Sequence, residues 1–170
     1  MKTTKGLKLI GKGSFTKCYL LNNTTVLLKS VDPIKEAMAY NWFPDSELFP
    51  EVLFSSLDGY YEMKYYPKVT SLKNNLDSDQ WLIYKQLRAL EIPFDRNDYN
   101  RYDNLYKLFG TLENNELREI MQDALGACSN YGTKIGFEIS PRNVACKNGK
   151  LILLDCFFMV DKLKEVRGNK

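Results

Sequence analysis

A change of hydrophobic pattern near Pro67 constrains the fold of this chain more than any other feature of its sequence. Before Pro67, residues 7–31 and 51–66 contain short apolar runs broken by turn-forming residues, as in antiparallel strands. After it, apolar residues recur at three- and four-residue intervals, as in helices. The sequence predicts an α+β protein with a strand-rich part over 1–66 and a helical part over 67–170. The predicted later helices cover 76–92, 97–112 and 114–131.

Two dipeptides predict tight hairpins, an Asp-Gly pair at 58–59 and an Asn-Gly pair at 148–149. Both pairs readily adopt the left-handed backbone that a two-residue turn requires. Between the third and fourth predicted strands, Asp32 and Pro33 start a segment with helical spacing that Pro44 ends. We therefore expect a five-stranded antiparallel sheet with one short helix, followed by the helical part and a second hairpin.

Composition excludes several kinds of function. The net charge is only +3, from 24 basic and 21 acidic residues, which is too small to indicate direct nucleic-acid binding, because that requires Lys and Arg clustered on one face. No apolar run approaches the roughly 20 residues of a membrane span, so we expect a cytoplasmic protein without membrane contact. The chain has no histidine, which excludes Ser-His-Asp and Cys-His catalysis, and its four cysteines form no CxxC pair. Chemistry would have to rest on carboxylates, lysine and a bound metal.

One candidate constellation is a glycine-containing turn followed by a lysine on a later strand. Glycines at such a turn let backbone N–H groups approach an anion, and Lys29, at the end of the run VLLK, could pair with phosphate. A plain turn and a solvated lysine are the alternative interpretation. The residues of the turn are Gly11, Lys12, Gly13, Ser14 and Phe15.

A second constellation surrounds the predicted hairpin near the end of the chain. Glu138 precedes Asn143 by five residues, and Asp155 directly follows the apolar run LILL. Carboxylate and amide oxygens are ligands that Mg²⁺ accepts together with phosphates and water. The alternative is structural, with Asn143 capping a turn after Pro141 and Asp155 ending a strand.

In this order along the chain, the two constellations resemble protein kinases. The run IGKGSFTKCYLL with VLLK resembles the glycine-rich loop and its strand lysine, YYEMKYYP resembles the hinge, and FEISPRNVACKNGKLILLD resembles the catalytic loop and metal-binding aspartate. The resemblance implies an ATP site with Mg²⁺ held by Asn143 and Asp155. It also implies that the 11–15 turn covers the phosphates and that Glu36 orients Lys29 by an ion pair.

The resemblance assigns the remaining roles by position. Glu138 stands where the family has the catalytic aspartate and would accept the proton of the substrate hydroxyl. Met63 would be the gatekeeper, with Lys64, Tyr65 and Tyr66 along the adenine edge.

The departures from the kinase pattern point to a reduced kinase. Thr16 replaces the third loop glycine, Gly136 and Phe137 replace the His-Arg pair, and Glu138 replaces an aspartate. Fifteen residues follow Asp155, which leaves no room for the usual peptide platform. The sequence is most similar to the small early serine/threonine kinases of short-tailed bacteriophages, which implies phosphorylation of host proteins or of the chain itself. The alternatives are an inactive pseudokinase that binds a host protein and, more remotely, a small-molecule kinase.

Overall fold

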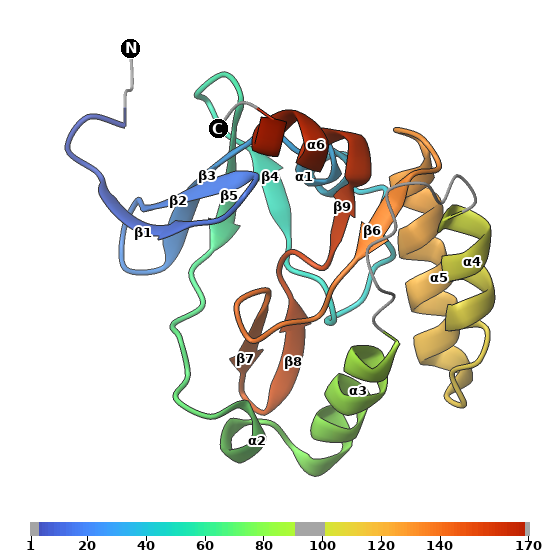
Figure 1. The fold of residues 1–170 in the computed structure, drawn as a ribbon. Helices are drawn as coiled ribbons and strands as arrows, with labels where there is room; N and C mark the ends of the chain where they lie inside the picture. Colours follow the sequence, from blue (N-terminus) through green and yellow to red (C-terminus); the bar gives the residue numbers. More distant parts are fainter. Residues whose placement is uncertain (1–3, 91–100, 169–170) are drawn as a thin grey trace.

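The first part of the chain folds as a five-stranded antiparallel sheet with the strand order β1-β2-β3-β5-β4 (Figure 1). The computed structural model describes residues 4–90 and 101–168. Helix α1 (Ile34–Ala39) connects β3 to β4, so the α+β class and the predicted sheet with one helix are confirmed. The strands are β1 (Lys8–Lys12), β2 (Thr16–Leu20), β3 (Thr25–Ser30), β4 (Val52–Phe54) and β5 (Tyr60–Lys64).

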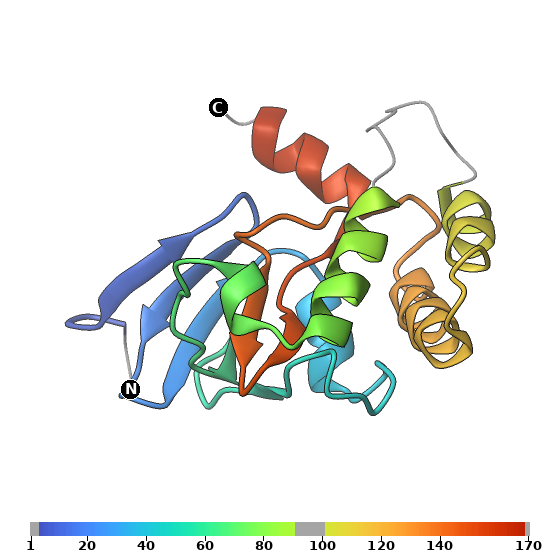
Figure 2. The ribbon, with the colours of Figure 1, turned by 90° about the horizontal axis from the view of Figure 1, so that it is seen from below.

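The second part combines helices with two small antiparallel sheets, β6 paired with β9 and β7 paired with β8. Figures 1 and 2 place the pair α4 and α5 on the side remote from the large sheet, with the small sheets between them. The predicted helix 97–112 is present as α4, and its first four residues lie outside the described ranges. The elements are α2 (Leu72–Asn75), α3 (Ser78–Ala89), α4 (Arg101–Phe109), α5 (Asn115–Ser129), β6 (Ile135–Phe137), β7 (Val144–Lys147), β8 (Lys150–Leu153), β9 (Phe157–Met159) and α6 (Val160–Gly168).

Both predicted hairpins are present, and the 148–149 hairpin has the predicted two-residue turn, whereas β4 and β5 are joined by the longer segment 55–59. Asn148 and Gly149 have φ values of 50° and 78°, the left-handed pair of a type I′ turn, and Gly59 has a φ of 72°. Gly149 is also required for space, because a Cβ there would lie 2.3 Å from a carboxylate oxygen of Asp77. This turn therefore packs directly against the start of α3, where the Asp77 N–H donates to the Gly149 carbonyl at 2.9 Å.

One hydrophobic core runs through both parts of the chain. It joins Val26 of β3 and Met38 of α1 to Leu125 of α5 and Phe157 of β9. Phe157 is the aromatic centre, with its ring centroid 5.3 Å from that of Phe137. The proposed division between 1–66 and 67–170 stays a prediction. In the described ranges, no helix is both long and apolar enough to cross a membrane.

Candidate functional site

Glu138, Asn143 and Asp155 are brought together by backbone hydrogen bonds at the ends of the small sheets. The Asn143 carbonyl accepts the N–H groups of Leu154 and Asp155 at 2.8 and 3.3 Å. The Glu138 N–H donates to the Cys156 carbonyl at 2.9 Å. The Glu138 side chain is exposed and those of Asn143 and Asp155 are partly exposed. Three polar groups that are up to 17 positions apart (138 to 155) thus share one exposed corner.

Asp155 forms an ion pair with Lys35 of α1, a residue that the sequence did not single out. The Lys35 Nζ lies 3.3 Å from Asp155 Oδ1, and the Lys35 side chain is 4% exposed against 36% for Asp155. The same Nζ donates to the Leu154 carbonyl and lies 3.9 Å from Met38 Sδ. A signal was available, because Lys35 precedes the apolar Met38 and Ala39 by three and four positions and so shares their helix face.

Lys29 lies on the opposite face of the sheet from this corner. Cross-strand partners share a face, and the core residues Val26 and Met63 are partners, so the alternate residues of β3 lie on the other face of the sheet, where Leu27 is buried outside the main core cluster. Lys29 lies on this other face, where its cross-strand partners are Lys17 and Tyr60. Its ammonium lies 5.4 Å from the centroid of the Tyr60 ring. The structure therefore does not bring Lys29 to Asp155.

Glu36 does not pair with Lys29 either. Its Oε2 accepts a hydrogen bond of 2.8 Å from the hydroxyl of Tyr131, just beyond the end of α5. Burial and the hydrogen bond to the Glu36 carboxylate raise the pKa of Tyr131. The contact therefore keeps Tyr131 a hydrogen-bond donor, and Glu36 fastens α1 to the helical part instead of orienting a lysine.

Asp32 fastens the other end of α1. Its Oδ1 accepts the Ile34 N–H at 3.0 Å and its Oδ2 accepts the Met159 N–H at 3.2 Å, which links the helix start to β9. The side chain is buried, and this burial is the main reason that its pKa is raised to about 6. Pro33 occupies the N-cap position that was expected of Asp32, and the Asp32 carboxylate instead joins the first residue of α1 to the strand that follows Asp155.

The 11–15 turn approaches the segment that follows Asp155. The Phe15 and Phe158 rings stack with centroids 5.8 Å apart. On the other side of Phe158, a Cβ at Gly136 would lie 2.2 Å from the ring, so the ring rests on a bare backbone. The N–H groups of Ser14 and Phe15 donate to no other described residue, which leaves them available to an anion.

The predicted hinge residues lie at the end of β5. Met63 is buried and is the cross-strand partner of Val26 and Val52, and its role as a gatekeeper stays a prediction. The Tyr65 N–H is used by the sheet, where it donates to the Thr24 carbonyl at 2.8 Å. The next N–H, that of Tyr66, donates to no described residue, so it is the better hydrogen-bond donor for a ligand along this edge.

The polar groups at the corner suit Mg²⁺ together with phosphates. Asp155 Oδ2 and the Asn143 side chain accept no hydrogen bond from a described residue, and both are oxygen donors of the kind that Mg²⁺ prefers. No cluster of three or more Asp, Glu, Cys or His side chains is present in the described ranges. These donors therefore fit a metal that takes most of its remaining ligands from nucleotide phosphates and water.

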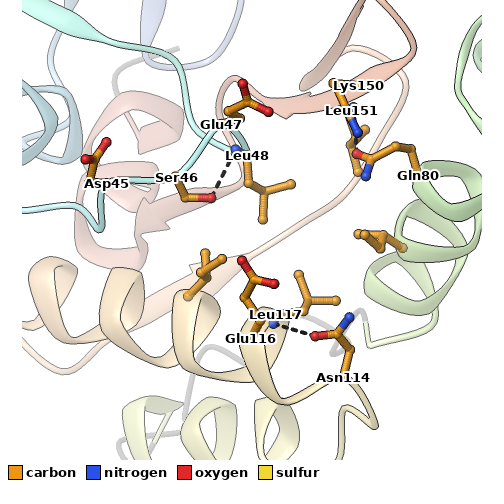
Figure 3. A pocket seen from close by; sticks show the side chains of 12 residues that line it. Asp45, Ser46, Glu47, Leu48, Gln80, Asn114, Glu116, Leu117, Lys150 and Leu151 are labelled. Atoms are coloured by element: carbon orange, nitrogen blue, oxygen red, sulfur yellow. Dashed lines mark hydrogen bonds between the residues drawn. The ribbon is translucent and has the colours of Figure 1, made fainter.

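A pocket of about 340 Å³ lies elsewhere, between α3, α5, β8 and the segment before β4 (Figure 3). Its polar lining includes Asp45, Glu47, Glu116 and Lys150. None of the predicted site residues lines it. This pocket is separate from the corner at Asp155.

No protein-family model and no curated protein sequence matches this chain. Among solved structures, it is similar to aminoglycoside phosphotransferases in a streptomycin–ATP–APH(2'')-IIa complex and a gentamicin–APH(2'')-IIa complex, each with a TM-score of 0.40 and 17% identity. The ADP-bound APH(2'')-Ib structure has a TM-score of 0.39 and 16% identity. The matches cover 89% of this chain and 65–66% of the others, so the chain spans just under two thirds of those proteins. The proposals below rest on the site geometry.

Proposed function

We propose that this chain is an ATP- and Mg²⁺-dependent kinase that phosphorylates hydroxyl groups of Ser, Thr or Tyr on host proteins, or on itself, in the host cytoplasm. The observation that supports this most strongly is the backbone-linked meeting of Glu138, Asn143 and Asp155. The contact between Phe15 and Phe158 adds the turn with its available N–H groups to the same corner.

In this proposal, each polar group at the corner would have one role in phosphoryl transfer. Asp155 and Asn143 would hold Mg²⁺, which supplies charge neutralisation on the phosphates when bound. The Ser14 and Phe15 N–H groups would contact phosphate oxygens, and Tyr66 would meet the adenine edge. The Glu138 carboxylate, exposed and without a partner among the described residues, would accept the hydroxyl proton as the new P–O bond forms, the bond to ADP breaks and ADP leaves.

The test is incubation of the purified protein with γ-labelled ATP, Mg²⁺ and a bacterial lysate. Label on discrete protein bands, lost in Asp155→Ala and strongly reduced in Glu138→Gln, is the expected result. Lys29→Ala is the matched control, because its side chain lies on the other sheet face and should keep full transfer. Label on an added aminoglycoside instead of protein would overturn the protein-acceptor proposal, and transfer that survives Asp155→Ala would overturn the site.

A pseudokinase that occupies a host protein is the second candidate. The observation that favours it is the Lys35–Asp155 ion pair, which already uses one oxygen of the proposed metal ligand. This candidate predicts thermal stabilisation by Mg-ATP without label transfer, together with co-purification of a single host protein. Transfer at a steady rate under saturating Mg-ATP would exclude it.

A further inference from the structure

Lys35 is a buried charge whose contacts are all accounted for. The residue is 3% exposed, and an ammonium at such a position needs close partners to offset its loss of hydration. Its Nζ has the Asp155 carboxylate, the Leu154 carbonyl and the Met38 sulfur around it. Two of these three partners belong to the Leu154–Asp155 segment, so the lysine fixes both the backbone and the side chain there.

The helix that carries Lys35 is itself held at two points. Asp32 bonds the Ile34 N–H and, across the core, the Met159 N–H. One turn further along, Glu36 accepts from Tyr131. Because α1 cannot shift without breaking these contacts, Lys35 presents its ammonium to Asp155 at a fixed place.

We propose that Lys35 is the positioning residue for Asp155 in the kinase site, and that Lys29 has no part in that site. This inference rests on the proposed function. Lys35 holds Oδ1 and thereby turns Oδ2 toward the metal, a task that the ion pair expected between Lys29 and Glu36 cannot perform from the other sheet face. Residues that orient a metal ligand in this way are commonly worth about 10- to 100-fold in metal affinity.

The test measures ADP affinity with Mg²⁺ and with EDTA, and takes the ratio as the metal enhancement. Lys35→Met should lower this enhancement about tenfold, whereas Lys29→Met, the matched control, should leave it unchanged. Thermal unfolding without nucleotide establishes that each variant is folded. If Lys35→Met does not fold, Lys35→Gln replaces it, because its amide, although one bond shorter than the lysine, keeps a neutral donor near the Leu154 carbonyl.

A double-mutant cycle separates positioning from general support of α1. If Lys35 acts through Asp155, Lys35→Met has no further effect on the metal enhancement in an Asp155→Asn background. An effect of equal size in that background would overturn the proposal. So would a rise of the enhancement in Lys35→Met, since it would mean that the ammonium competes with the metal.

The outcomes also distinguish this inference from the function on which it rests. Wild-type protein without Mg²⁺-dependent ADP binding refutes both. If the wild type shows Mg²⁺-dependent ADP binding and Lys29→Met abolishes it, the inference is wrong. It is also wrong if both Lys35 variants retain that binding in full. Neither result contradicts the proposed kinase site.

Discussion

Gly136→Ala should destabilise the protein through a single clash. A Cβ at Gly136 would lie 2.2, 2.3 and 2.7 Å from three atoms of the Phe158 ring, which is its direct partner across the β6–β9 pair. Ordinary carbon contacts begin near 3.5 Å, so the ring must retreat by about 1.3 Å. Phe15 stacks with the Phe158 ring, so such a retreat also disturbs that contact.

The expected cost follows from two opposing terms. Overpacking of this kind costs about 1–3 kcal/mol. Replacing glycine by alanine reduces the entropy of the unfolded chain, which stabilises the folded state by about 0.4–1 kcal/mol. The net loss is about 0–2.6 kcal/mol, and about 1.3 kcal/mol at the midpoints of the two ranges, which for a chain of this size lowers the unfolding temperature by roughly 3–5 °C. Urea unfolding and calorimetry measure both quantities.

Gly126→Ala in α5 is the matched control, because a Cβ there meets no atom within 4 Å. It should leave stability unchanged or raise it by up to about 1 kcal/mol, since alanine suits a helix interior better than glycine. In a Phe158→Ala background the clash is absent, so Gly136→Ala should cost nothing further. A Gly136→Ala protein as stable as the Gly126→Ala protein would refute the reasoning.

Three further predictions follow from the buried polar groups. Because burial raises the pKa of Asp32 from 3.8 to about 6, the folded state holds a proton that the unfolded state releases, and stability should fall by about 2–3 kcal/mol as pH rises from 4 to 6. In Asp32→Asn, urea unfolding should show no such fall in stability between pH 4 and 6. If stability falls equally with pH in Asp32→Asn and in the wild type, the prediction is wrong. Tyr131→Phe should cost about 1–2 kcal/mol by removing the donor to Glu36, with no added cost in a Glu36→Ala background, where the acceptor is already absent. Cys128 and Cys156 are buried, which raises the pKa of both thiols, that of Cys156 to about 12. A thiol reagent at pH 8 should therefore label only the other two cysteines in the folded protein, and rapid labelling of all four would be inconsistent with this core.

Local chemistry made part of this structure predictable from the sequence. The turns at 58–59 and 148–149 were predictable because Gly59, Asn148 and Gly149 readily adopt a left-handed backbone that few other residues adopt. Asn143 and Asp155 could be grouped because a short hairpin necessarily returns the chain to its start. Glu138 could be added to them only through the resemblance to kinases, because its contact with Cys156 adjoins the β6–β9 pair. By contrast, β6 and β9 have three residues each, too few for a periodic pattern to be visible.

The sequence alone could not show that Lys35, and not Lys29, pairs with Asp155. Residues 26–28 are all apolar and all buried, so the alternation that would reveal the face of Lys29 is absent. Lys35 shares a helix face with Met38 and Ala39, which indicates that it is buried, but its partner Asp155 lies 120 positions later (155 against 35) and is not indicated by that pattern. Charge pairing between distant segments is set by tertiary packing, and the local pattern carries no record of it.

The anchoring of α1 has a consequence for the order in which the molecule folds. Its contacts bridge 95 positions to Tyr131, 119 to Leu154 and 127 to Met159. Closing loops of this length lowers the entropy of the chain before the stabilising contacts have formed, and this slows folding. During synthesis, the sheet and α1 emerge long before their partners do. The corner at Asp155 can form only after that residue has left the ribosome, so the nascent chain carries an unpaired Lys35 while the next 120 positions (155 against 35) are made.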